Sequence, residues 1–116
     1  MKYTVIVSDR ARQMLGQHLR FLAQVDRQAA ERLKKRFLEE FRSLERMPQR
    51  YPFFDAEFIP PNRYHKLFVE NSFLVLYQVR DDTVYVDWIV DCRQDYSWLL
   101  KKPFFDFPQQ LMPSLR

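Results

Sequence analysis

Three short runs of β-branched and aromatic residues within residues 64–96 constrain the fold more than any other feature. Polar breaks at residues 70–72 and 80–82 separate the runs. Apolar runs divided in this way are typical of β-strands joined by tight turns. The segment is therefore predicted to form a meander of three antiparallel strands, and any functional surface is expected on or beside that sheet.

The chain before the meander is predicted to contain one strand and two helices. Residues 3–7 form a short β-branched run, which predicts the strand. Apolar residues then recur at three- and four-residue spacing over residues 10–25 and again over residues 26–46. A short break between two amphipathic helices predicts an antiparallel helical hairpin. Together these segments predict an α+β fold in which the first strand and the meander complete one sheet.

Side-chain alternation predicts which residues of the meander face the helices. In the middle run the predicted set is Phe73, Val75, Tyr77 and Val79. In the last run it is Val84, Val86, Trp88 and Val90. The opposite face of the middle run carries Leu74, Leu76 and Gln78. That face is apolar enough to need covering, either by a partner or by the tail of the chain.

The phase of the first run of the meander depends on which of its side chains are buried. Burial favours Leu67 and Val69 facing the helices, with Lys66 and Phe68 on the open face. His65 would then point inward or lie at the start of the strand. A bulge of one residue would reverse this assignment.

Two segments are irregular because of their prolines. Residues 47–63 contain four prolines and predict a connector whose aromatic residues pack against the domain. Residues 101–116 combine three prolines with several aromatic residues and predict an extended tail on the domain or on a partner. We therefore expect one domain over residues 1–100, followed by the tail.

Composition narrows the class of protein. The chain of 116 residues suits one domain and has no apolar run long enough to cross a bilayer. It lacks a signal-peptide pattern, and the single Cys92 excludes an internal disulfide or a cysteine-cluster zinc site. These features favour a cytoplasmic protein with no membrane partner. The net charge of +4 favours nucleic acid or an acidic protein as partner, or only a solvated helix face.

The predicted order of elements resembles the RelE/ParE superfamily of toxins from bacterial type II toxin–antitoxin systems. The resemblance is carried by residues 64–69, 76–79 and 84–96, which read Tyr-His-Lys-Leu-Phe-Val, Leu-Tyr-Gln-Val and Val-Tyr-Val-Asp-Trp-Ile-Val-Asp-Cys-Arg-Gln-Asp-Tyr. It covers about residues 1–98 and implies a toxin that a cognate antitoxin neutralises. RelE-like members cut mRNA in the ribosomal A site, whereas ParE-like members poison DNA gyrase and carry no nuclease site.

The resemblance also implies where a nuclease site would lie. RNA cleavage needs a general base, a proton donor for the leaving oxygen, and cations for the charged transition state. The matching candidates are His65 and Lys66 on the first meander strand, then Arg93 and Tyr96 after the last. Arg63 could supply a further phosphate contact. No two-histidine metal spacing is present, so we expect neither a metal nor another cofactor.

The sequence departs from the nuclease pattern in several places. Leu74 and Leu67 stand where RelE-like toxins carry basic residues, and Asp87 and Asp91 add negative charge near the expected phosphate. The usual constellation is therefore incomplete. We predict ribosome-dependent mRNA cleavage. Gyrase inhibition and a non-catalytic protein-binding module on the same fold remain the alternatives.

Each candidate residue also has a structural interpretation. His65 could be a core residue, and Lys66 could keep its face soluble. Arg93 could form a local ion pair at the exit of the last strand, and Tyr96 could pack against a neighbouring aromatic residue. His18, in the first helix, is predicted to lie on the surface.

Overall fold

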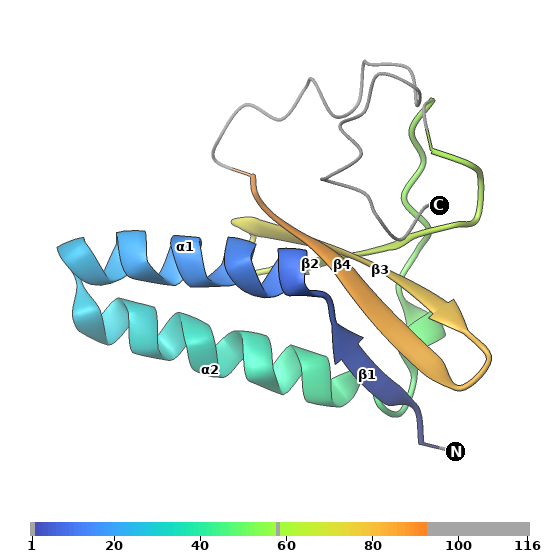
Figure 1. Ribbon diagram of the computed structural model, residues 1–116, viewed down its shortest axis with the longest axis horizontal. Coiled ribbons are helices and arrows are strands. Elements are labelled where there is room, and N and C mark those ends of the chain that lie inside the picture. Colours follow the sequence, from blue (N-terminus) through green and yellow to red (C-terminus); the bar gives the residue numbers. More distant parts are fainter. Residues whose placement is uncertain (1, 58, 93–116) are drawn as a thin grey trace.

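A computed structural model describes residues 2–57 and 59–92 and places a helical hairpin against a four-stranded sheet (Figure 1). The elements in chain order are β1 (Thr4–Val7), α1 (Asp9–Val25), α2 (Arg27–Ser43), a 3₁₀ turn η1 (Pro48–Arg50), β2 (His65–Val69), β3 (Phe73–Arg80) and β4 (Thr83–Asp91). The predicted α+β fold is confirmed. The predicted tail, residues 101–116, and the domain boundary before it lie outside the described residues.

The sheet is mixed and has the strand order β1-β4-β3-β2. Strands β2, β3 and β4 form the predicted antiparallel meander. Strand β1 pairs with β4 in parallel, with Thr4 opposite Thr83 and Val7 opposite Val86. The N-terminal strand therefore lies beside the last strand of the meander and closes that edge of the sheet.

Capping side chains set the ends of the helices. The hydroxyl of Ser8 accepts a hydrogen bond from the backbone of Ala11 at 3.0 Å, which starts α1. Asp26 ends α1 and starts α2, because its carboxylate accepts from the backbone of Ala29 at 3.0 Å. One residue thus makes the whole turn of the hairpin. Helix α2 ends at Ser43 and not near residue 46 as predicted, because the chain continues there as turns.

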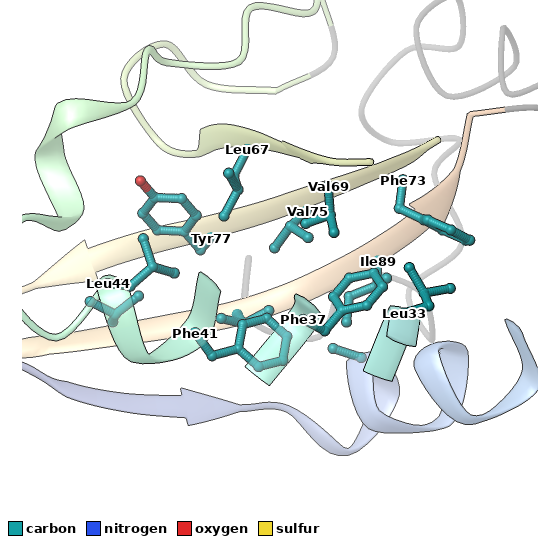
Figure 2. Close-up of a cluster of buried hydrophobic side chains, with 13 residues drawn as sticks. Leu33, Phe37, Phe41, Leu44, Leu67, Val69, Phe73, Val75, Tyr77 and Ile89 are labelled. Atoms are coloured by element: carbon teal, nitrogen blue, oxygen red, sulfur yellow. The ribbon is translucent and has the colours of Figure 1, made fainter. Parts of the chain in front are cut away.

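The main core lies between the hairpin and one face of the sheet (Figure 2). Phe37 is fully buried and packs its ring 5.5 Å from the ring of Phe73. All four residues of β3 that were predicted to face the helices belong to this helix-side core. Leu67 and Val69 also belong to it, which confirms the predicted phase of the first meander strand.

A β-bulge changes the phase of β4 halfway along its length. Val86 pairs with Tyr77, but Trp88 pairs with Leu76, so Asp87 is an extra residue without a partner position. Before the bulge, Val86 faces the helices as predicted. After it, the alternation is shifted by one residue.

The prediction for the second half of β4 is therefore wrong. Ile89 belongs to the helix-side core, whereas Trp88 and Val90 pack on the opposite face with Leu74 and Leu76. A single inserted residue has this effect because side chains alternate with a period of two.

The connector covers the opposite face of the sheet. Phe54, Ile59 and Tyr64 are buried there against Leu76 and Trp88. We call this second cluster the outer core. The face that needed covering is thus occupied, among the described residues, by the irregular segment that precedes β2. The expected packing of the connector's aromatic residues is confirmed for Phe54.

Helix α1 contacts the part of β4 that β1 does not pair with. Strand β1 ends at Val7, and beyond it the imidazole Nε2 of His18 lies 3.0 Å from the carbonyl oxygen of Ile89. The ring of His18 also lies 5.2 Å from that of Phe73. His18 is half-buried, so its predicted surface position is wrong. It satisfies a carbonyl group that β1 is too short to reach.

Candidate functional site

The first meander strand carries the candidate nuclease residues that the structure describes. Strand β2 lies at the edge of the sheet, and the connector runs along part of its free side. The backbone of Lys66 donates to the carbonyl of Pro52 at 2.9 Å, and Phe54 donates to the carbonyl of Tyr64 at 2.7 Å. These bonds fix the backbone that presents the candidates.

His65 lies inside the protein with its ring held on both sides. Its side chain is 5% exposed, and the ring stacks at 4.3 Å from Phe53 and at 5.1 Å from Tyr77. Its Nδ1 lies 2.7 Å from the carbonyl oxygen of Tyr51. A carbonyl oxygen can only accept, so this nitrogen carries a proton. The arrangement agrees with the structural interpretation of His65.

Tyr77, whose ring stacks on the other side of His65 from Phe53, is itself fully buried. Its hydroxyl donates a short hydrogen bond to the carbonyl of Pro48. Burial raises the pKa of Tyr77 well above its ordinary value of 10. The phenol therefore stays neutral and joins the centre of the sheet to the 3₁₀ turn η1.

Lys66 points to the other face of the sheet. It pairs with Leu76 of the outer core, whereas His65 pairs with Tyr77 of the helix-side core. Adjacent residues of a strand point to opposite faces. His65 and Lys66 therefore cannot act on one ligand from the same surface. Lys66 is half-buried and its neighbour Phe68 is 48% exposed.

Within the described residues, no other candidate is recorded in contact with Lys66. Arg63 is half-buried and lies in the turn before β2. Arg93 and Tyr96 lie outside the described residues, so their predicted roles stay predictions. Leu67 and Leu74 are buried in the two cores, as expected for apolar replacements of basic residues.

A buried polar cluster lies where the bulge turns Asp87 toward the outer face. The carboxylate of Asp87 accepts from the hydroxyl of Tyr64 at 2.9 Å and from the side-chain amide of Gln78 at 2.8 Å. The three side chains are between 0% and 5% exposed. Arg80 donates to the amide oxygen of Gln78 at 3.2 Å and extends the cluster toward solvent.

This cluster holds the connector onto the sheet. Strand β2 begins at His65, so Tyr64 is the last residue of the connector and not the first of the strand. Gln78 belongs to β3 and Asp87 to β4, so the three hydrogen-bonded groups join three segments. From the sequence, Asp87 is expected only to add negative charge near a phosphate, and the cluster is not predicted. The available signal was the presence of single polar residues, Gln78 and Asp87, inside otherwise apolar strands.

Comparison with known proteins identifies the family. Residues 5–96 match the family described as the ParE toxin of the type II toxin–antitoxin system, parDE. The chain belongs to this ParE toxin family. The match covers nearly all of the described fold and extends over Arg93 and Tyr96. No curated protein matches the sequence.

A solved structure supports the fold assignment of this ParE-family toxin. A chain of the chromosomal ParDE TA system from P. aeruginosa is similar, with a TM-score of 0.63 and 12% sequence identity. The similarity covers 78% of this chain and 96% of that chain. At this identity the comparison concerns the fold alone. The family match confirms the resemblance to the RelE/ParE superfamily, and a ParE toxin has a cognate antitoxin as partner.

Two absences concern the described part of the toxin. Within residues 2–57 and 59–92, His, Cys, Asp and Glu side chains form no group of three that could hold a metal ion. In the same residues, neither helix has the length and hydropathy needed to cross a membrane.

Proposed function

We propose that this toxin arrests growth by inhibiting DNA gyrase without cutting RNA, and that the cognate antitoxin prevents this. The match of residues 5–96 to the ParE family supports the proposal, because ParE-like members of the superfamily poison gyrase. Ribosome-dependent mRNA cleavage, the activity predicted from the sequence, is the alternative.

The position of His65 carries the argument against a nuclease. A general base must reach the 2′-hydroxyl of the RNA within hydrogen-bond distance. The imidazole of His65 is 5% exposed, stacked between two aromatic rings and hydrogen-bonded to a backbone carbonyl. It lies on the face of the sheet that the helices cover. A nuclease would have to work without it.

The outer face of the sheet also supports a binding function over a catalytic one. Leu76 and Trp88 are buried beside Lys66 under the connector, and the buried carboxylate nearby belongs to Asp87. An apolar floor and a carboxylate are poor surroundings for the charged phosphate of a cleavage transition state. Inhibition of an enzyme by binding needs no such groups.

The experiment is induction of the toxin alone in growing bacteria, with mapping of RNA 5′ ends and analysis of DNA breaks in one culture. Purified toxin would also be added to a gyrase supercoiling reaction. We expect growth arrest, DNA breaks and lost supercoiling, with no new codon-phased mRNA ends. The same profile is expected from Arg93→Ala and Tyr96→Phe if those residues have no role in cleavage.

Codon-phased mRNA ends that appear with the wild-type toxin and disappear in Arg93→Ala would overturn the proposal in favour of cleavage. Lys35→Ala, a change of an exposed residue on α2, is the control for loss of a positive charge. Arrest without either signature would point to a binding module with another target.

A further inference from the structure

The hairpin of α1 and α2 extends past the end of the sheet, so the last turns of α1 project beyond the strands (Figure 1). In this part of α1, Phe21 is 70% exposed and Val25 is 80% exposed. They are the two most exposed large apolar side chains within residues 2–57 and 59–92. Because they are four residues apart in a helix, they lie side by side and form one small apolar surface.

These two residues continue a row whose first half packs on the sheet. Met14, His18, Phe21 and Val25 are spaced four, three and four residues apart, which places them along one side of α1. Met14 packs against both cores, and the imidazole of His18 lies 3.0 Å from the carbonyl oxygen of Ile89. The sheet therefore covers the first half of the row, and the second half extends beyond it.

The polar residues beside the apolar pair are uncharged. On the exposed side of α1, the neighbours of Phe21 one turn before and one turn after are Gln17 and Gln24. Removing a charged group from water is costly unless it finds a partner. A segment that covers Phe21 from this side would remove no charged group from water, so an apolar segment of the chain fits this surface.

The chain leaves the sheet close to this row. Strand β4 ends at Asp91, two residues after Ile89, whose carbonyl group contacts His18. The sequence continues through a mainly polar link, residues 92–97, to the consecutive apolar residues Trp98-Leu99-Leu100. A segment with the chemistry that the exposed surface needs therefore follows within a few residues of the same place.

The link is long enough to reach the exposed pair. From His18 to Val25 the helix rises about 10 Å, at 1.5 Å per residue. The chain from Asp91 to Trp98 can span up to about 23 Å, at 3.3 Å per residue. Two side chains provide far less area than the roughly 800 Å² per partner of a stable complex between two chains. A tethered segment needs less area because its effective concentration is high.

We propose that Trp98, Leu99 and Leu100 dock on Phe21 and Val25 and anchor the chain to the tip of the hairpin. The docking residues follow directly after the region that matches the ParE family, residues 5–96. The anchor is therefore an addition of this chain to the matched fold.

The anchor has a consequence for two candidate residues, because Arg93 and Tyr96 belong to the link. Strand β4 lies two positions from β2 in the sheet, or about 10 Å. Docking at α1 directs the link away from β2 and therefore separates Arg93 and Tyr96 from Lys66. The proposed gyrase inhibition does not depend on this path, so the two proposals can fail separately.

The fluorescence of Trp98 tests whether it is covered. The only other tryptophan, Trp88, is 1% exposed, and subtracting the emission of Trp98→Phe from that of the wild type isolates Trp98 without a change in the core. We expect emission at short wavelength and weak quenching by acrylamide. Phe21→Glu, measured against the same variant with Trp98→Phe, should shift this emission to longer wavelength and increase the quenching.

Leu38→Glu is the matched control, because it changes another exposed apolar side chain of the hairpin that lies outside the row. It should leave the emission and the quenching of Trp98 unchanged. Circular dichroism and melting temperature show whether each variant is folded. A solvent-exposed Trp98 in the wild-type protein, or equal effects of Phe21→Glu and Leu38→Glu, would overturn the proposal.

Disulfide trapping tests the contact directly and identifies the occupant. Val25→Cys and Leu99→Cys are combined with Cys92→Ser, so that one pair of cysteines is present. Oxidised glutathione should link this pair within one chain, and the same experiment with Leu38→Cys in place of Val25→Cys should give no link. Links formed only between two chains would overturn the proposal in favour of a second copy. Equal trapping of both pairs would also overturn it.

Discussion

The two faces of the sheet are covered by different kinds of structure. The helix-side face packs against two regular helices whose apolar residues, such as Leu33 and Phe37, recur at helical spacing. The outer face packs against an irregular connector that contributes Phe54, Ile59 and Tyr64. On the outer face the buried carboxylate of Asp87 accepts from a residue of the connector and from one of the sheet, whereas on the helical side the buried carboxylate of Glu40 in α2 accepts from Tyr51.

The difference shows how the hairpin and the connector are each attached to the sheet. A helix satisfies its own backbone hydrogen bonds, so apolar packing is sufficient to attach it. Apart from the 3₁₀ turn η1, the described part of the connector forms no helix that would satisfy its own backbone groups. It is attached by apolar side chains, by backbone bonds to β2 and by the bond from Tyr64 to Asp87. We therefore expect the helix-side face to supply most of the stability and the outer face to depend on specific polar contacts.

The largest expected effect is that of removing a ring from the helix-side core. Phe37→Ala should lower the free energy of unfolding by about 3–5 kcal/mol, because Phe37 is fully buried between regular elements that cannot collapse into the cavity. Phe54→Ala, on the outer face, should cost about 2 kcal/mol, since an irregular segment can move into the space. Urea denaturation of both variants measures the difference. Equal losses would contradict the contrast between the two faces.

The second effect concerns the buried polar cluster. Asp87→Ala removes the acceptor of bonds from Tyr64 and Gln78 and should lower the free energy of unfolding by about 2 kcal/mol. Tyr64→Phe should then cost less in the Asp87→Ala background than in the wild type, because the two side chains share one bond. Asp55→Ala, an exposed change in the connector, is the control. Additive losses would show that the bond from Tyr64 does not hold the connector.

The regular part of the fold could be predicted because each element has an uninterrupted period. The inward residues of β3, from Phe73 to Val79, alternate without a break, and the helices keep their three- and four-residue spacing. The second half of β4 could not be predicted in this way. The bulged Asp87 shifts the alternation by one, and a bulge has little signal in a single sequence.

The candidate site depended on contacts that periodicity does not encode. His65 is buried by Phe53 and Tyr51, which belong to a connector whose path follows from tertiary packing. His18 contacts the carbonyl group of Ile89 in β4 because β1 ends before it reaches that residue. The end of a strand is hard to predict from a sequence, so this contact could not be predicted. Arg93 and Tyr96 lie outside the described residues, and their roles remain predictions.

The smallest expected effect at neutral pH lies where the helix-side core meets the connector. Tyr77→Phe removes the hydrogen bond to Pro48 and should cost about 1 kcal/mol. The pH dependence is more informative. Burial raises the pKa of Tyr77 in the folded protein, so above pH 10 the unfolded chain releases this proton while the folded chain keeps it.

The stability that depends on neutral Tyr77 is thus complete below pH 10 and is lost as the pH rises toward its folded pKa. The loss should reach about 1.4 kcal/mol per pH unit for this one group. Tyr77→Phe cannot ionise, so it should become less sensitive to alkali than the wild type, and the two stabilities should converge above pH 10. Urea denaturation between pH 8 and about pH 11 follows both proteins across the titration range. If both proteins lose the same free energy of unfolding as the pH rises, Tyr77 is accessible enough to water to ionise in the folded state. The connector would then exclude water from the helix-side core less well than its contacts indicate.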